Sequence, residues 1–135
     1  MPIELDHKSY MDKFFEWSQE YEDKVGTWSW GDDRDWGDAV WESLLEPFLK
    51  VCEAKKWSQI RSEKYYNKKG GHYKYIYYTL DQIKQEAFDR LIELELDDFD
   101  RIFRFRIDRN KRLYGFVMNQ VFGLVWYDPN HNIYK

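Results

Sequence analysis

The sequence predicts an α+β domain in which N-terminal helices precede a small, mainly antiparallel sheet of about four strands with one helix packed on it. Apolar residues recur at helical spacing in several stretches before residue 95. After Phe103 they alternate with polar residues, a period typical of strands. The chain has 135 residues, of which 43% are hydrophobic and 34% charged, so we expect one domain over residues 1–135. Residues 1–56 would be its helical, tryptophan-rich, acidic part, and residues 57–135 a strand, a helix and three strands.

Two helices are expected in the N-terminal part. The first begins at a capping-box pattern at Ser9 to Asp12 and ends before Gly26, because aromatic residues recur three or four positions apart over Tyr10–Tyr21. A second apolar stripe extends from Trp41 to Cys52, with Asp38 as its cap. Pro47 interrupts this stripe. Since proline lacks the amide and crowds the preceding turn, we expect a kink or a new helix start near Glu46.

The C-terminal part alternates between the two periods. Tyr73, Tyr75 and Tyr77 predict a strand, and a capping box at Thr79 predicts a helix whose stripe extends from Leu80 to Leu94. A strand follows from Phe103, and a hairpin over residues 113–127 turns at 119–120. The segment 128–130, Asp-Pro-Asn, ends the last strand with turn residues.

A simple hairpin register shows which side chains would meet across the sheet. It pairs Met118 with Val121 and Ile107 with Arg112. One row would contain Arg106, Leu113 and Trp126, and the next would contain Arg104, Gly115 and Leu124; Phe105, Tyr114 and Val125 would lie on the other face. Two arginines would therefore share a face with Trp126. Arginine stacked on an aromatic ring is a common way to hold RNA, and also a common way to cover apolar surface.

Charge is distributed in blocks along the chain. Residues 1–50 carry a net charge of −8, residues 51–75 of +5, residues 76–100 of −6 and residues 101–135 of +5. Acidic helices could simply neutralise basic strands within one molecule. Alternatively, the second and fourth blocks together form a basic face for phosphate or an acidic partner.

The segment between the two predicted helices contains glycines, acids and four tryptophans. Its tryptophans either tuck beneath the domain or form an exposed patch. If exposed, Trp28, Trp30 and Trp36 would form a protein-binding epitope, because an acidic loop repels phosphate.

Cys52 is the only cysteine, so no intrachain disulfide is possible and a cysteine-rich metal site is excluded. The sequence has no apolar run of membrane-spanning length and no signal-peptide pattern at its start. We therefore expect a soluble, cytoplasmic protein. We expect no metal and no cofactor, since no ligand spacing or nucleotide-binding motif is present.

The residues able to carry chemistry are few. His131 follows the Asp128-Pro129 turn, and His72 follows two glycines in a basic segment. Either imidazole could act as an acid or a base near neutral pH. The carboxylate of Asp128 could cap local amides or orient the imidazole of His131.

The segment from His72 to Tyr134 resembles a small protein that recurs in bacteria and to which no function is attached. The resemblance covers about half of the chain and ends in the WYDPNH motif; the matching positions are His72, Ala87, Arg90, Leu91, Asp97, Asp98, Phe105, Arg106, Arg112, Gly115, Phe122, Trp126, Asp128, Pro129 and His131. The segment is also similar to RelE-like ribonuclease toxins, which finish with an arginine-bearing strand, a hairpin and a terminal His/Tyr pair. This chain departs from those toxins in its acidic balance and in its additional N-terminal part.

Two functions from different classes follow. In the first, the protein is an RNA-directed, toxin-like ribonuclease that needs no metal. His131 or His72 would act on a 2′-hydroxyl, with Tyr134 or Tyr127 assisting. Substrate would be held by Arg104, Arg106, Arg112, Trp126 and Asp128. In the second, it is a non-catalytic inhibitor or accessory factor of a phage, plasmid or defence system that binds a partner protein through its acidic, tryptophan-rich surface.

Overall fold

The computed structural model describes residues 10–31, 34, 36–63 and 74–135, and a mixed sheet lies at its centre. The five strands of this sheet are β1 (Glu16–Ser18), β2 (Tyr75–Thr79), β3 (Arg101–Asp108), β4 (Lys111–Met118) and β5 (Val121–Asp128). Their order is β1-β5-β4-β3-β2. β1 is parallel to β5, and the other neighbours are antiparallel. The predicted α+β class is confirmed, and the sheet has one strand more than expected.

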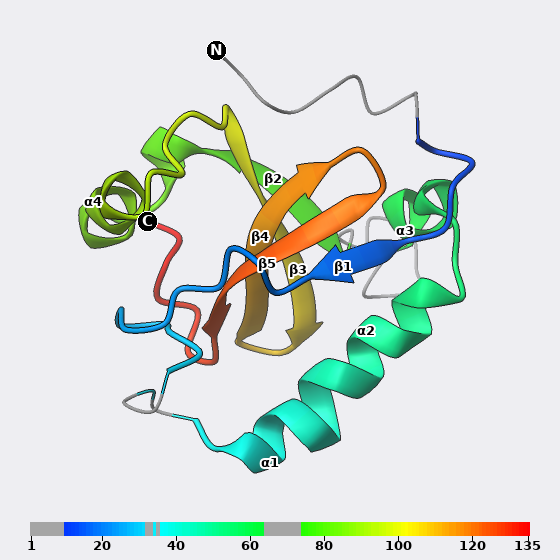
Figure 1. Cartoon of the computed structure of the whole chain (residues 1–135), viewed down its shortest axis with the longest axis horizontal. Helices are drawn as coiled ribbons and strands as arrows, with labels where there is room; N and C mark the ends of the chain where they lie inside the picture. The colour runs from blue at the N-terminus through cyan, green and yellow to red at the C-terminus, as the bar shows by residue number, and fades with distance from the viewer. Residues whose placement is uncertain (1–9, 32–33, 35, 64–73) are drawn as a thin grey trace.

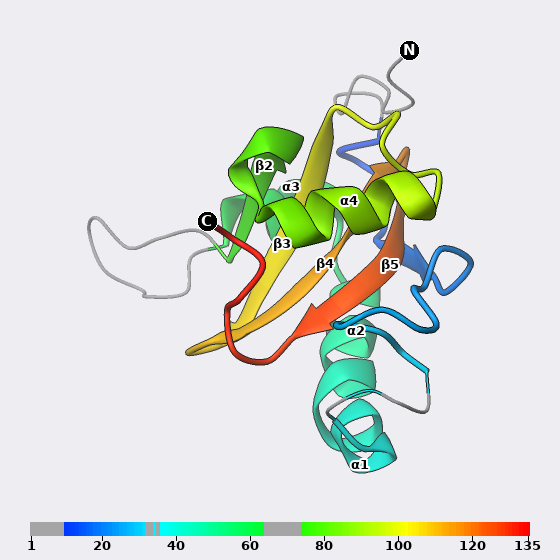
Figure 2. The same ribbon diagram turned by 90° about the vertical axis from the view of Figure 1, so that its left-hand side faces the viewer.

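Helices cover both faces of the sheet (Figures 1 and 2). On one face lies a helix built from α1 (Asp38–Val40), the π-helical segment η2 (Trp41–Leu45) and α2 (Glu46–Glu53), followed by α3 (Trp57–Ser62). On the other face lies α4 (Gln85–Glu93), which the 3-10 turn η3 (Leu80–Gln82) precedes. No helix in the described ranges is long and apolar enough to cross a membrane.

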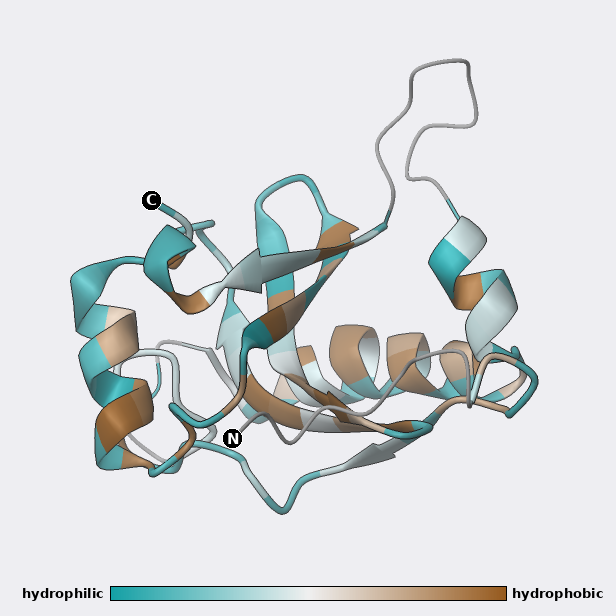
Figure 3. Cartoon of the chain, turned by 90° about the horizontal axis from the view of Figure 1, so that it is seen from above, coloured by the Kyte–Doolittle hydropathy of each residue, from teal (hydrophilic) through white to brown (hydrophobic). Residues whose placement is uncertain are grey.

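Two apolar layers result, one on each side of the sheet. The layer under α1, α2 and α3 contains Leu45, Leu49, Trp57, Phe103, Phe105, Leu113 and Tyr127. The layer under α4 contains Ala87, Leu91, Ile102, Tyr114, Phe116, Val125 and Trp126. Figure 3 shows the same division, with hydrophobic residues along the strands and along the long helix and hydrophilic residues in the turns.

The first predicted helix is absent from the described residues 10–26, which contain β1 and turns. Phe14 is 54% exposed, whereas Phe15 is buried at 1%. The buried aromatic positions therefore do not follow the helical stripe that began at Tyr10. The prediction failed because the aromatic residues at 14, 15 and 17 fit the spacing of a strand as well as that of a helix. Pairing with β5 stabilises the strand by more than local helical spacing stabilises a helix.

The second predicted helix is confirmed, including the irregularity at Pro47. The helix is π-helical up to Leu45, and the amide of Glu46 donates to the carbonyl of Trp41, five residues earlier. Pro47 then occupies the first turn of α2. Because proline has no amide to donate and crowds the preceding turn, it interrupts the helical hydrogen-bond pattern at this point. Gly37, rather than Asp38, is the N-cap residue.

The helix predicted after Thr79 begins later than expected. The capping box between Thr79 and Gln82 is present, but it opens only the turn η3. α4 starts at Gln85, because the amide of Lys84 donates to the carbonyl of Ile133 at 2.7 Å and so holds residue 84 in an extended conformation. The C-terminal tail thus sets where this helix begins.

Next to each turn, the strands pair in the register that the sequence predicted. Farther from the turn, the pairing is shifted by one residue. Met118 pairs with Val121 as predicted, but a bulge between Tyr114 and Gly115 moves Trp126 opposite Tyr114. A second irregularity, at Ile107, moves Arg106 opposite Arg112. The predicted rows of Arg106 with Trp126 and of Arg104 with Gly115 are therefore wrong. A bulge inserts one unpaired residue, and alternation alone does not reveal it.

Candidate functional site

The irregularity at Ile107 brings three arginines to the face of the sheet that α4 partly covers, and the β4–β5 bulge brings Asp128 beside them. Arg106 pairs with Arg112, and Arg112 pairs with Asp128 on its other side. The next row contains Arg104 and Tyr114. The simple register put Arg112 on the opposite face from Arg106, so the tertiary pairing adds a third guanidinium. We call Arg104, Arg106, Arg112, Asp128, His131 and Tyr134 the arginine site.

The C-terminal tail, residues 129–135, supplies the other side of the arginine site. It lies beside β2 and next to the start of α4 (Figures 1 and 2). Tyr134 forms a bridge with Ile83, and the amide of Lys135 donates to the carbonyl of Gln82 at 3.1 Å. These contacts hold His131 and Tyr134 against the sheet rather than at a free end.

Asp128 organises the turn from which His131 projects. Its Oδ2 accepts hydrogen bonds from the amides of Asn132 at 2.6 Å and Ile133 at 2.8 Å. Burial raises the pKa of Asp128, and these backbone hydrogen bonds oppose the rise. His131 has a φ of 56°, a left-handed conformation that the capped turn supports. Of the two roles considered for Asp128, local capping is the one its contacts show.

Four side chains form a stacked series at the edge of the arginine site. The ring of Tyr134 stacks on Tyr78 at 4.5 Å between centroids, and the ring of His131 is parallel to Tyr134 at 6.2 Å. The guanidinium of Arg104 lies 5.7 Å from the Tyr78 ring centroid. The stack orients the imidazole and connects it to the buried arginine.

The electrostatic field of the site is positive. Arg104 and Arg112 are 7% and 5% exposed, and burial lowers the pKa of both guanidinium groups. Burial also lowers the pKa of His131, and the charges of Arg112 and Arg104 lower it further. Since an imidazole titrates near 6.5 in water, His131 is neutral at pH 7 and can accept a proton.

Several polar atoms of this region are buried without a hydrogen-bond partner among the described residues. They are the Nε atoms of Arg104 and Arg112, Oη of Tyr114, Oδ1 of Asp128 and Nε2 of His131. Neither Arg104 nor Arg112 forms an ion pair with a carboxylate in this part of the chain, although Arg112 donates through Nη1 to three turn carbonyls. Buried donors are normally satisfied, so the two guanidinium Nε atoms mark a place where an anionic ligand would be favourable, whereas Oδ1 of Asp128 can only accept a hydrogen bond.

Two predicted positions, Trp126 and Tyr127, are not available to a ligand of the arginine site. Trp126 is fully buried, and its indole donates to Asp23 at 2.9 Å, so it is not available to stack on RNA. Tyr127 points to the opposite face, where it packs on Trp36. His72 lies outside the described residues.

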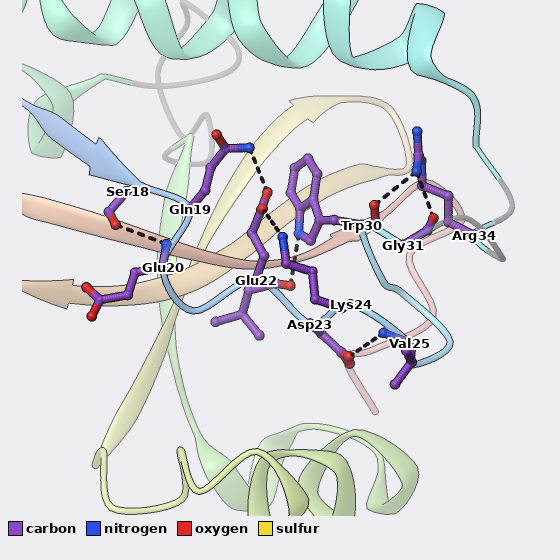
Figure 4. Close-up of polar contacts among 11 residues, drawn as sticks. Ser18, Gln19, Glu20, Glu22, Asp23, Lys24, Val25, Trp30, Gly31 and Arg34 are labelled. Atoms are coloured by element: carbon purple, nitrogen blue, oxygen red, sulfur yellow. Dashed lines mark hydrogen bonds and ion pairs between the residues drawn. The ribbon is translucent and has the colours of Figure 1, made fainter.

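The tryptophan segment packs against β5 rather than forming an exposed patch. Trp28 and Trp36 are 6% and 8% exposed, so they cannot form the proposed epitope. Trp30 is half-buried, and its indole donates to the carbonyl of Val125 at 3.0 Å (Figure 4). The amide of Asp23 donates to the same carbonyl at 3.1 Å, which fixes the segment along the strand. The burial of aromatic surface stabilises this packing by more than the acidic composition of the loop opposes it.

Sequence reasoning missed Tyr78 and Tyr114. Tyr78 carries the ring on which Tyr134 stacks, and Tyr114 lies beside Arg104 with a pKa that burial raises. A signal for Tyr78 was present, because it breaks the alternation of Tyr73, Tyr75 and Tyr77 and so points to the opposite face. Tyr114 could not have been placed without the bulge.

No group of three or more histidine, cysteine, aspartate or glutamate side chains that could hold a metal ion occurs within the described ranges. Comparisons with protein-family models, curated proteins and solved structures find no match to this chain.

Proposed function

We propose that this protein is an RNA-directed, toxin-like ribonuclease of a bacterial or mobile-element system, and that it cleaves without a metal ion. The observation that carries the proposal is the arginine site: two buried guanidinium groups, which have no carboxylate partner among the residues that the structure describes, lie beside an imidazole that is neutral at pH 7. Arg104, Arg106 and Arg112 would bind the scissile phosphate. Arginine suits this role, because its fork of donors matches phosphate oxygens and stabilises the charge that develops on them.

The chemistry follows from the roles of the two tail residues. His131 would remove the proton of the ribose 2′-hydroxyl, and the 2′-oxygen would attack the phosphorus atom as the bond to the 5′-oxygen breaks. The hydroxyl of Tyr134 would supply the proton that the leaving 5′-oxygen takes up. The products are a 2′,3′-cyclic phosphate and a free 5′-hydroxyl. His72 remains the second candidate for the acid.

The resemblance to RelE-like toxins is a second, separate argument for the proposed ribonuclease function. It rests on an arginine-bearing strand, a hairpin and a terminal His/Tyr pair, which correspond to β3, the β4–β5 hairpin and the tail of this chain. A likeness of this kind raises the expectation of ribonuclease chemistry but does not specify the RNA.

The test is inducible expression in bacteria of the wild type, of His131→Ala and of Asn132→Ala. Asn132 is exposed and contributes only its backbone amide to the turn, so its substitution is a matched control. We expect growth arrest and RNA fragmentation with the wild type and with Asn132→Ala. Loss of the base should lower cleavage by about 100-fold or more in His131→Ala.

The purified protein offers a second measurement, the pH dependence of RNA cleavage. Because the pKa of His131 is lowered, activity should rise with pH through an inflection below 6.5. Retained cleavage in folded His131→Ala would remove this residue from the mechanism. Normal growth and intact RNA with the wild type would instead favour the non-catalytic binding protein, whose acidic surface would then rest on Trp30 and its neighbours Asp38 and Glu42.

A further inference from the structure

A second site lies on the opposite side of the molecule, between the helix α2 and strand β3. Here the described residues form a half-open pocket of about 310 Å³. Its volume falls at the lower end of the range of about 300 to 1,000 Å³ that is common for small-molecule sites. The arginine site faces the other layer of the sheet, so the two sites are separate.

The wall of the pocket is apolar. Helix residues form one side and β3 residues the other, and the lining includes Leu44, Phe48, Val51, Ile60, Phe105 and Ile107. Cys52 completes the wall, and burial raises the pKa of its thiol to about 12, so it stays uncharged. Val51 is 57% exposed, which places apolar surface at the opening as well as inside. Apolar ligand area is favoured on such a surface.

The polar groups of the pocket are three charged side chains. Lys55 and Glu63 form an ion pair at 2.6 Å and neutralise one another. Lys74 also lines the pocket and forms no ion pair with a described residue. The pocket therefore combines an apolar wall with one positive charge in excess, and its three charged side chains come from the basic block 51–75.

We propose that this pocket binds a medium-chain fatty acid, with its alkyl chain on the apolar wall and its carboxylate on the ammonium group of Lys74. A neutral apolar ligand would form no ion pair with Lys74, and a small polar anion would leave the apolar wall exposed to water. A carboxylate on an alkyl chain both pairs with Lys74 and covers the apolar wall. The inference is independent of ribonuclease activity.

The experiment is a titration of the full chain with octanoate, followed by NMR of methyl-labelled protein. Methyl groups of Leu44, Val51, Ile60 and Ile107 should shift and saturate together, while methyl groups under α4 stay unchanged. Lengthening the acid from six to eight carbons should tighten binding about fourfold per methylene. Octanol, which has the same chain without the charge, should bind about tenfold more weakly than octanoate.

Two charge-reversal variants assign the carboxylate. Lys74→Glu should weaken octanoate binding about tenfold or more and leave octanol binding unchanged. Lys13→Glu makes the same charge change at an exposed position outside the pocket and should bind octanoate as the wild type does. Equal affinity for octanoate and octanol, or unchanged octanoate binding in Lys74→Glu, would overturn the assignment of an anionic ligand. Absence of saturable shifts at these methyl groups would overturn the site itself.

Discussion

The carboxylate of Asp23 is fully buried and accepts hydrogen bonds from four residues. Arg90 donates to it through Nε at 3.0 Å and Nη2 at 2.8 Å, and the indole of Trp126 donates at 2.9 Å. The amides of Val25 and Gly26 complete the set. Burial raises the pKa of Asp23, but the hydrogen bonds outweigh it and hold the pKa at about 2. One residue thus joins the N-terminal segment, α4 and β5.

Replacing Asp23 should therefore be costly. We expect Asp23→Asn to lower the free energy of unfolding at pH 7 by about 3 kcal/mol, because it leaves the partly buried guanidinium of Arg90 without its counter-charge. Urea unfolding monitored by tryptophan fluorescence measures this change. If the variant has the same free energy of unfolding as the wild type, the Asp23–Arg90 ion pair makes no net contribution to stability.

The same substitution changes the pH dependence. The folded pKa lies below the ordinary value of 3.8, so the stabilisation is complete above pH 3.8 and is lost as the pH falls toward 2. The difference between wild type and Asp23→Asn should shrink by roughly 2 kcal/mol over that window. Asp97→Asn, at an exposed carboxylate, is the control, and its difference from wild type should stay constant.

The β4–β5 hairpin is the element that builds the arginine site. Its bulge places both Val125 and Trp126 under α4 and brings Asp128 opposite Arg112. At the bulge the two strands approach so closely that a Cβ on Gly115 would lie 2.2 Å from the carbonyl oxygen of Gly123. The nearest atom is backbone, which cannot move aside as the end of a flexible side chain can, and two atoms of the Phe122 ring follow at 2.8 Å.

Gly115→Ala should therefore destabilise the protein by about 2 kcal/mol, since the added methyl group forces the strands apart. Gly37→Ala is the matched control, because a Cβ at residue 37 meets nothing within 4 Å. Its effect should stay within about 1 kcal/mol. Chemical denaturation at pH 7 gives the free energy of unfolding of both variants. An equal loss of stability in the two would contradict the close approach of the strands at the bulge.

Across the whole molecule, the arrangement of charge matters more than its sum. The chain has a net charge of −4, yet Arg104, Arg106 and Arg112 gather on one face of the sheet. Arg104 and Arg106 each lower the pKa of Arg112, which shows that the three charges repel one another. A bound anion would relieve this repulsion and stabilise the folded state by linkage.

We expect inorganic phosphate to raise the melting temperature of the wild type by a few degrees relative to sodium chloride of equal ionic strength. Arg106→Gln, at a half-exposed position, should reduce the rise. Arg109→Gln removes the same charge from an exposed turn residue and should preserve it. Thermal unfolding by circular dichroism gives the three values. An equal rise in both variants would place the anion elsewhere.

Much of the fold could be predicted from residue patterns. Period-two alternation identified β2, β3 and the β4–β5 hairpin, and the turn at Asn119 was placed correctly, with a φ of 55°. The effect of Pro47 on its helix followed from the missing amide alone. These features depend on interactions between residues close in sequence, so local pattern suffices to find them.

The candidate site could be predicted in composition but not in arrangement. Arg104, Arg106, Arg112, Asp128, His131 and Tyr134 were all named from the sequence, and the structure brings them to one region. Trp126 was placed there too and is instead buried on Asp23, 103 residues away in sequence. No local pattern encodes a hydrogen bond over that separation.

The sequence by itself determined the α+β class, the strands β2 to β5 and the turns between β3, β4 and β5, the position of the helical irregularity and the residue types at the site. Only the tertiary structure decided that residues 16–18 form an edge strand, that the tryptophan segment packs on β5, and that the irregularity at Ile107 turns Arg112 to the face of Arg104. The first set follows from propensity and period over a few residues. The second depends on which distant surfaces bury the most area and satisfy the most backbone groups, a comparison that the folded chain alone makes.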